Sequence, residues 1–177
     1  MLRKIDGPWL TEPTEVLFEY AGLQCAMLRR DAHSHWRGYV GLPKDHPLYG
    51  VGYREESPAL ALALEARKEM PLGEKAGLGL ILSVLLGGEL TANPETVFVV
   101  HGGLTFAEDR IATENAPEGL WWFGFDCAHA GDLSLEYGNV TGEEVWCDVN
   151  YARAETELLA DQLATVARPA LAERSEG

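Results

Sequence analysis

The pattern of apolar and polar positions along the 177 residues predicts several short strands and helices. Residues 15–20 and 23–28 are both rich in β-favouring side chains, and they flank Ala21-Gly22, where a glycine suits a tight turn. We therefore expect a β-hairpin near the start of the chain. A third strand is expected near Trp36–Val40, after a polar loop.

Two later apolar segments are also expected to be strands. Thr96–Val100 is β-favouring and ends at His101, where the chain turns on two glycines. Leu120–Asp126 is an aromatic strand whose side chains alternate between two faces. Because Gly124 shares a face with Asp126, we expect open space beside that carboxylate. Two weaker segments are a loop at Phe106–Glu118 and a short edge strand at Val145–Cys147.

The centre of the chain has the signals of two helices. Ser57 is a hydroxyl N-cap followed by Pro58, and the helix that starts there is expected to run to about Met70, because Pro71 disfavours helical geometry before it. A second helix is expected over Glu74–Leu86 from its leucine spacing. Their apolar stripes are expected to pack into the core.

A third helix is expected at the C-terminal end, capped by Asp148 or Asn150 and ending before Pro169. These elements predict one α+β domain over residues 1–177, with residues 170–177 as a frayed tail. The expected sheet is small, mixed or antiparallel, and begins with the N-terminal hairpin. Two central helices and the C-terminal helix are expected to cover it.

Composition narrows the class of protein. The 46% hydrophobic and 24% charged content is ordinary for a folded domain. The apolar run at 76–88 is shorter than the roughly 20 residues that a membrane span needs. The N-terminus lacks the apolar core of a signal peptide. Three widely spaced cysteines without a Cys-x-x-Cys pair indicate reduced thiols, so we expect a cytoplasmic protein. Because the apolar run is too short to span a bilayer, we also expect that the protein does not enter a membrane.

The net charge of −14 argues against general nucleic-acid binding. One segment is locally basic, however, with a balance of +3 from five basic and two acidic residues (Arg29, Arg30, Arg37, Lys44 and Arg54 against Asp31 and Asp45). This segment is a candidate site for a small anion. Alternatively, its arginines pair with the surplus acids. His33 and His35 in the same segment are a candidate metal pair if the third strand begins early.

The strongest candidate for chemistry is a set of four residues that follow predicted strands: His101, Asp126, His129 and Asp132. If the two strands are neighbours and run in the same direction, these side chains converge at one end of the sheet. Imidazole and carboxylate groups bind zinc, manganese or iron, and they also serve in general acid–base catalysis. The alternative is a structural network in which each polar group is hydrogen-bonded.

Further residues are candidates for holding a ligand beside this set. Backbone N–H groups at Gly102 and Gly103 could approach a ligand oxygen, although two glycines also serve a tight turn. The other candidate ligand-binding residues are Arg37, Lys44, His46 and Trp122.

Several motifs together resemble an uncharacterised family of proteins encoded mostly by bacteriophages and prophages. They are Gly38-Tyr-Val-Gly-Leu-Pro43, His101-Gly-Gly-Leu-Thr105, Trp121-Trp-Phe-Gly-Phe-Asp-Cys-Ala-His-Ala-Gly-Asp132 and Tyr151-Ala-Arg-Ala-Glu155. The likeness covers roughly residues 23–53 and 97–166, and it implies that residues 57–95 are an added helical element. It also implies a phage or prophage origin, and so the host cytoplasm, but it supplies no activity.

Three function classes remain open from the sequence. The first is a metal-dependent hydrolase acting on a small phosphate-containing molecule, and the second is a non-catalytic binder of a small anionic ligand. The third is an acidic interaction protein that inhibits a host factor, for example by mimicking DNA. Because polar residues cluster at predicted strand ends, we favour a His/Asp-rich pocket that binds, and in the first class hydrolyses, a small anion. The oligomeric state does not follow from the sequence.

Overall fold

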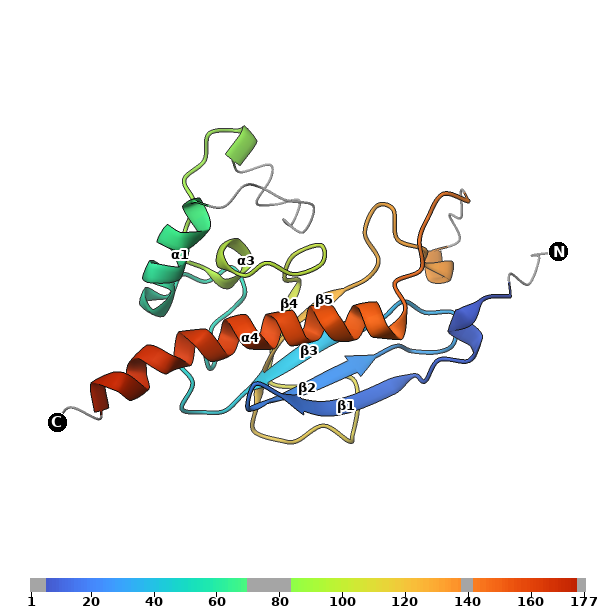
Figure 1. Cartoon of the computed structure of the whole chain (residues 1–177), viewed down its shortest axis with the longest axis horizontal. Helices are drawn as coiled ribbons and strands as arrows, with labels where there is room; N and C mark the ends of the chain where they lie inside the picture. Colours follow the sequence, from blue (N-terminus) through green and yellow to red (C-terminus); the bar gives the residue numbers. More distant parts are fainter. Residues whose placement is uncertain (1–5, 70–83, 138–141, 175–177) are drawn as a thin grey trace.

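The computed structural model describes residues 6–69, 84–137 and 142–174. Five strands form one antiparallel sheet in the order β1-β2-β3-β5-β4 (Figure 1). Their bounds are β1 Glu15–Tyr20, β2 Leu23–Leu28, β3 Arg37–Leu42, β4 Phe106–Glu108 and β5 Trp121–Asp126. The sheet and the helices described below confirm the expected α+β class.

The N-terminal hairpin forms as the sequence indicates. Ala21 and Gly22 both have positive φ, 52° and 76°, and Tyr20 pairs with Leu23 across the turn. A two-residue turn with positive φ at both central positions matches the right-handed twist of the flanking strands. The hairpin and the third strand are therefore confirmed.

One face of the sheet is covered by the long helix α4, Val149–Arg174 (Figure 1). Asp148 caps it, because its Oδ1 accepts the backbone N–H of Tyr151 at 2.8 Å. The helix lies close to β3, and a Cβ at Gly38 would overlap Phe125 and Thr156. The expectation that the helix ends before Pro169 was wrong: it continues to Arg174, although proline lacks the N–H that would bond the preceding turn.

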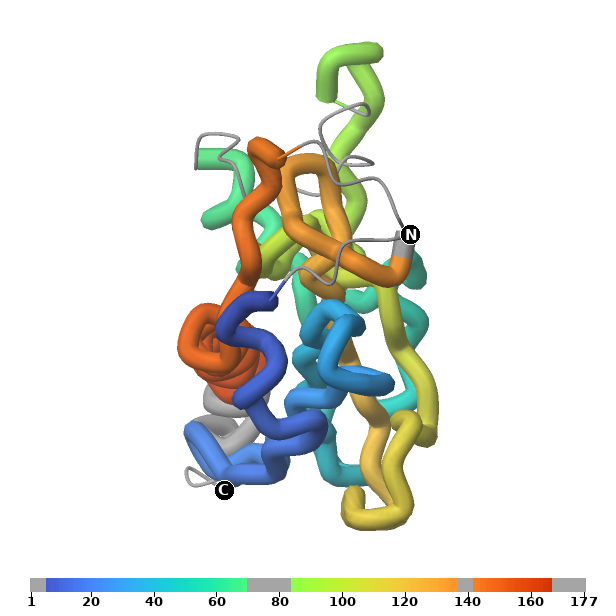
Figure 2. Tube along the Cα trace, turned by 90° about the vertical axis from the view of Figure 1, so that its right-hand side faces the viewer, coloured from blue at the N-terminus to red at the C-terminus, as the bar shows by residue number. Residues whose placement is uncertain are grey.

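The other face of the sheet is covered by chain that precedes β5. Figure 2 shows α4 on one side of the strands and the segment around residue 115 on the opposite side. Tyr39 and Trp122 are buried there and pack against Phe106. The expected loop at Phe106–Glu118 therefore begins as β4. The expected space beside Asp126 was also wrong, because a Cβ at Gly124 would lie 2.6 Å from the Tyr39 ring.

Two short helices, α1, Ala61–Lys68, and α3, Pro94–Val97, lie beside α4 (Figure 1). A helix starts at Ser57-Pro58 as expected, because η2, Pro58–Leu60, leads into α1. The expected hydroxyl cap was wrong, since the Ser57 side chain makes no capping hydrogen bond. Two other short helices are η1, Pro8–Leu10, and η3, Leu135–Tyr137. Most of the expected helix over Glu74–Leu86 lies outside the described residues. In the described part of the chain, no helix is long and apolar enough to cross a membrane.

The segment before His101 is not a strand of the sheet, in contrast to our expectation. The side chain of Gln162 on α4 takes both backbone groups of Val99, accepting its N–H and donating to its carbonyl, each at 2.8 Å. Glu155, two turns earlier on α4, accepts the N–H of His101 at 2.9 Å. The segment is thus held against the helix, and it brings His101 to the end of the sheet where β5 finishes.

Candidate functional site

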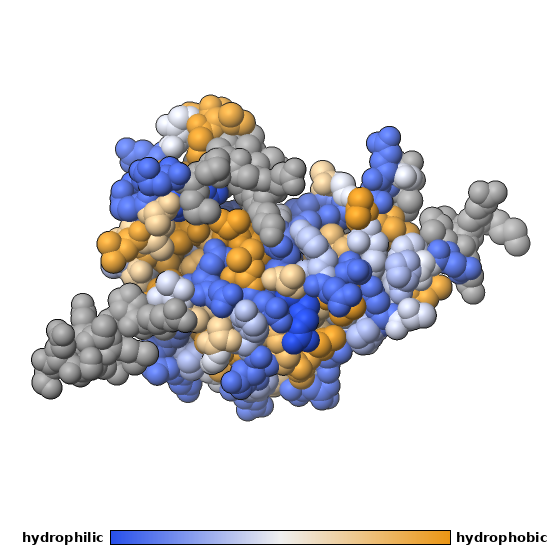
Figure 3. Space-filling model, in the orientation of Figure 1, coloured by the Kyte–Doolittle hydropathy of each residue, from blue (hydrophilic) through white to orange (hydrophobic). Residues whose placement is uncertain are grey.

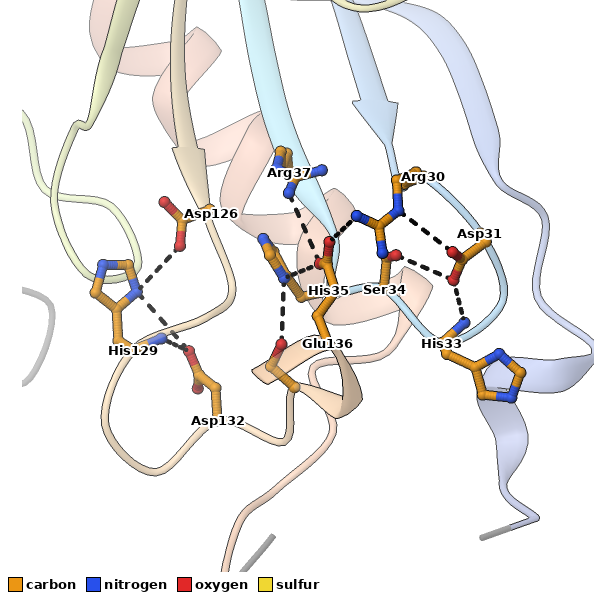
Figure 4. Close-up of polar contacts among 11 residues, drawn as sticks. Arg30, Asp31, His33, Ser34, His35, Arg37, Asp126, His129, Asp132 and Glu136 are labelled. Carbon is orange, nitrogen blue, oxygen red and sulfur yellow. Dashed lines mark hydrogen bonds and ion pairs between the residues drawn. The ribbon is translucent and has the colours of Figure 1, made fainter. Parts of the chain in front are cut away.

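Three of the four residues predicted to carry chemistry meet in space. His101, His129 and Asp132 each offer one donor atom, and these atoms lie within 4.8 Å of one another. His101 comes from the segment along α4, whereas His129 and Asp132 come from the loop after β5. Figure 4 shows the His129 ring between Asp126 and Asp132. The convergence was expected, but a helix-bound segment produces it, not a pair of parallel strands.

The His101 ring is fixed from both sides. Its Nε2 lies 2.7 Å from Asp132 Oδ2, and its Nδ1 lies 2.8 Å from the hydroxyl of Tyr151. Burial and the nearby Glu155 raise the pKa of Tyr151 to about 12, so its hydroxyl keeps its proton at neutral pH and donates to Nδ1. The partners therefore assign the imidazole proton to Nε2, which donates to Asp132. The result is a hydrogen-bonded chain of tyrosine, histidine and carboxylate.

The His129 ring leaves one nitrogen directed at carboxylate oxygens without a hydrogen bond. Nδ1 lies 3.8 Å from Asp132 Oδ2 and 3.9 Å from Asp126 Oδ1, both too long for a hydrogen bond. This atom is buried and has no hydrogen-bond partner among the described residues. A buried nitrogen that faces two carboxylates at this separation suits a shared cation.

Asp132 orders the loop as well as the site. Its Oδ2 also accepts the backbone N–H of His129 at 2.8 Å. Burial by itself would raise the pKa of Asp132, but the hydrogen bonds from His101 and His129 outweigh burial and hold that pKa below its usual value. The carboxylate is therefore ionised at neutral pH.

Asp126 lies at the edge of the cluster. Its Oδ2 accepts the Thr105 hydroxyl at 3.1 Å, and its Oδ1 faces His129. It does not belong to the set of donor atoms within 4.8 Å. Asp126 is therefore placed to orient His129 and not to share a ligand with His101.

Gly102 and Gly103 make the turn that brings His101 into place. Both have positive φ, 65° and 85°, and the N–H of Gly103 donates to the Val100 carbonyl at 2.9 Å. A Cβ at Gly102 would overlap the His129 ring. The glycines thus allow a tight turn and the close approach of the His129 ring. A tight turn was the alternative that the sequence left open beside an anion-binding role for these glycines.

Two thiols that sequence reasoning treated as isolated belong to the site. Cys127, Cys147 and His101 form a second group whose donor atoms lie within 4.8 Å. The Cys147 thiol also donates to Asp132 Oδ1 over 3.5 Å. A hydrogen bond with the Cys147 thiol, together with burial, raises the pKa of the Cys127 thiol. The position of Cys127 between Asp126 and His129 was the signal that could have found it.

The predicted ligand residues outside the His/Asp cluster do not join it. His46 is a core histidine, buried with Nδ1 accepting the Leu48 N–H and Nε2 facing the Leu163 carbonyl, each at 3.1 Å. Lys44 and the buried Trp122 line a pocket of about 800 Å³ beside the 109–120 segment. The expected joint ligand site was wrong for these three residues, because the sheet and α4 separate them from His101.

The basic segment is largely neutralised, as the alternative interpretation held. Arg30 and Arg37 face Glu136 at 2.8 and 3.8 Å, and Arg54 pairs with Glu95 at 2.9 Å. Arg37 nevertheless lies near the site, because it pairs with Asp126 in the sheet register. Its guanidinium group forms an ion pair with Glu136 (Figure 4).

The prediction that His33 and His35 form a metal-binding pair was wrong. β3 begins only at Arg37, so the two histidines lie in a turn and not on one face of a strand. His35 is buried with Nδ1 3.0 Å from Glu136, whereas His33 is exposed (Figure 4). Their side chains therefore occupy different environments.

An apolar hollow of about 740 Å³ lies away from this cluster, between α1, α3 and α4. Figure 3 shows apolar side chains gathered on that side of the molecule. Its lining carries none of the imidazole, thiol or carboxylate donors described above.

Neither a scan against protein-family models nor searches of curated proteins and of solved structures found a match. The phage origin and the host partner therefore stay predictions from the motifs. The candidate site rests on the geometry of His101, His129, Asp132 and the two thiols.

Proposed function

We propose that this protein binds one divalent transition-metal ion at His101, and that the metal-bound form binds and hydrolyses a small phosphate-containing anion. The observation that carries the proposal is that two sets of donor atoms overlap at His101. One set adds His129 and Asp132, and the other adds Cys127 and Cys147. Zinc and iron take nitrogen, carboxylate and thiolate ligands in proteins, and manganese takes nitrogen and carboxylate ligands.

The distances suit a metal ion. Ligand bonds to zinc are about 2.0–2.3 Å long, so two tetrahedral ligands lie about 3.3–3.8 Å apart. His129 Nδ1 lies 3.8 Å from Asp132 Oδ2. Because His129 Nδ1 has no hydrogen-bond partner among the described residues, a metal bond at that atom would not break an existing contact. His101 Nε2 and Asp132 Oδ2 lie 2.7 Å apart, so they would have to separate by about 1 Å and exchange their hydrogen bond for bonds to the ion.

We expect the bound small molecule to be an anion, because the metal ion would supply the positive charge that attracts it. Arg30 and Arg37 are paired with Glu136, so these arginines are poor candidates for holding an anion alone. A metal ion with an open coordination position polarises a phosphoryl oxygen and lowers the pKa of bound water. If the set with Cys127 and Cys147 holds the ion, His129 is free of the metal, would lie next to such a water and could accept its proton.

Metal titration tests the proposal. Zinc or manganese added to the wild-type protein and followed by calorimetry should bind at one ion per chain, and His101→Ala should lose that binding because both donor sets include His101. His33→Ala is the matched control, since His33 is exposed and outside both sets. Equal binding in wild type and His101→Ala, or no binding in either, would reject the proposal.

The hydrogen-bonded chain favours a second candidate, general acid–base catalysis without a metal. Tyr151, His101 and Asp132 are linked at 2.8 and 2.7 Å, an arrangement in which the carboxylate orients the ring that exchanges a proton with the hydroxyl. Hydrolysis of a phosphoester that persists in excess chelator and is lost in Tyr151→Phe would support this candidate. Activity lost on chelation would favour the metal.

A further inference from the structure

The two donor sets at His101 differ in the kind of metal that they select. The set with His129 and Asp132 offers nitrogen and oxygen, which manganese and iron accept as well as zinc. The set with Cys127 and Cys147 offers two sulfurs and one nitrogen, and soft sulfur ligands select zinc over manganese. Which set holds the ion therefore decides which metal the protein uses.

Building on the proposed function, we infer that the ion is zinc and that Cys127, Cys147 and His101 hold it. These three groups come from separate parts of the chain, and their donor atoms all lie within 4.8 Å of one another. Tetrahedral zinc with sulfur bonds of about 2.3 Å would place its ligands about 3.5–3.8 Å apart, so the ligand atoms need to move by about 1 Å or less. Each thiol would release its proton to solvent on becoming a ligand.

The surroundings of each ligand fit this role. The backbone N–H of Cys127 donates to the Trp36 carbonyl at 2.9 Å, which fixes the start of the loop against β3. Cys147 immediately precedes Asp148, the cap of α4, so the helix start positions it. The Tyr151 hydroxyl lies 2.8 Å from Nδ1 of His101, and its oxygen would accept a hydrogen bond from Nδ1–H once Nε2 holds the metal. Such a partner fixes the orientation of a metal-binding imidazole.

His129 and Asp132 then occupy the open side of the ion. Asp132 contacts two of the three residues that would hold the ion, Cys147 at 3.5 Å and His101 at 2.7 Å, so its carboxylate would be the nearest group to serve as an exchangeable fourth ligand. A ligand or a water that displaces the carboxylate would meet His129, whose Nδ1 is buried beside it. Three protein ligands and one exchangeable position are typical of catalytic zinc sites.

Cobalt substitution tests the inference, because Co²⁺ takes zinc sites and reports its ligands in its absorption spectrum. The reduced full-length protein, loaded with Co²⁺ under anaerobic conditions, should show a thiolate-to-cobalt charge-transfer band in the near ultraviolet. Cys127→Ser and Cys147→Ser should each weaken the band and lower cobalt affinity at least about 100-fold, the upper end of the loss caused by removing an outer partner.

Two controls separate a lost ligand from a lost fold. Cys25→Ala removes a thiol that is buried in β2 and outside both donor sets, and it should keep the band. His129→Ala should also keep the band, because His129 lies outside the set of Cys127, Cys147 and His101. Circular dichroism of every variant checks that the fold is retained.

The outcomes distinguish the inference from the function on which it rests. Cobalt bound at one ion per chain without the charge-transfer band would overturn thiolate ligation and leave the metal site with His129 and Asp132. A band that survives in both serine variants would overturn it as well. No cobalt bound at all would overturn both the inference and the proposed function.

Discussion

Asp132 joins the two donor sets through its two carboxylate oxygens. Oδ2 accepts from the His101 ring and from the His129 backbone, and Oδ1 accepts from the Cys147 thiol. A single side chain therefore positions an imidazole, a loop and a thiol. Asparagine at this position would offer only one acceptor oxygen, so the geometry of the whole cluster depends on the carboxylate.

At the residue scale, Gly102→Ala is expected to destabilise the protein more than a matched glycine change. Gly102 and Gly50 both have positive φ, 65° and 81°, but a Cβ at Gly102 would overlap the His129 ring while none of the described atoms lies within 4 Å at Gly50. Overpacking costs about 1–3 kcal/mol beyond the backbone strain that both variants share. Urea unfolding of the two variants measures the difference. Equal losses of stability would contradict the close approach of His129.

A second residue-scale prediction concerns His46 and pH. Burial lowers the pKa of His46, although the bond to Leu163 opposes this, so the folded protein keeps the ring neutral while the unfolded chain binds a proton. The stability is therefore complete above the unfolded pKa of about 6.5 and is lost as the pH falls toward the lower folded value. Buried His35, whose pKa is lowered in the same way, adds to the loss in every variant.

Substitution isolates the share of His46 in this loss. In His46→Gln the free energy of unfolding should fall less between about pH 7 and about pH 5 than in the wild type. His33→Gln, which changes an exposed histidine, should keep the wild-type dependence. Parallel curves for wild type and His46→Gln would show that His46 is not held neutral in the folded protein.

At the scale of elements, the two faces of α4 have different structural roles. Its apolar side packs on β2 and β3, while Glu155 and Gln162 hold the backbone before His101. Residues two helical turns apart lie on one side of a helix, so the spacing of these two side chains matches an extended segment laid along it. The helix thus supports the sheet and positions His101, the residue that both donor sets share.

Gln162→Ala tests this second role. It removes three hydrogen bonds, one to the Leu158 carbonyl and two to Val99, and it leaves the N–H and the carbonyl of Val99 without their partner. The loss should cost about 1–3 kcal/mol of folding stability. Metal affinity should fall as well, because the segment that carries His101 loosens. Gln24→Ala is the control, since its contact to Glu19 at 3.3 Å is exposed and should cost little. A stable Gln162→Ala variant with unchanged metal binding would argue against the role of α4.

Elements with strong local signals could be predicted from the sequence. The Ala21-Gly22 turn, the alternating aromatic strand β5 and the Asp148 cap all act over a few residues, and each formed as expected. Thr96–Val100 failed because its β-favouring side chains say nothing about the distant Gln162, which takes the backbone groups of Val99. Tertiary contacts overrode local preference there.

At the scale of the whole molecule, the layers place the site at one end of the sheet. α4 covers one face and the 109–120 segment covers the other, so the loop after β5 emerges between covered faces (Figure 2). His101, His129 and Asp132 could be predicted as a cluster because each follows an apolar segment. The two thiols were missed because Cys147 lies 20 positions beyond Cys127, and only the folded chain shows them next to His101.

Metal binding should be visible in the stability of the whole chain. A ligand that binds only the folded state adds about 2.7 kcal/mol to the free energy of unfolding at 100 times its dissociation constant. Zinc should therefore raise the melting temperature of the wild type, and a chelator should reverse the rise. His101→Ala should show neither effect. A rise of equal size in that variant would place the bound zinc elsewhere.

The most direct test of the metal site is elemental analysis of the purified, untagged protein before and after chelation. Zinc near one ion per chain before chelation and none after it, with no zinc in His101→Ala, is the result that the overlapping donor sets lead us to expect. Wild-type protein free of zinc, manganese and iron, with a melting temperature that does not change in chelator or added zinc, would contradict the metal site. His101, His129 and Asp132 would then be a hydrogen-bonded polar network.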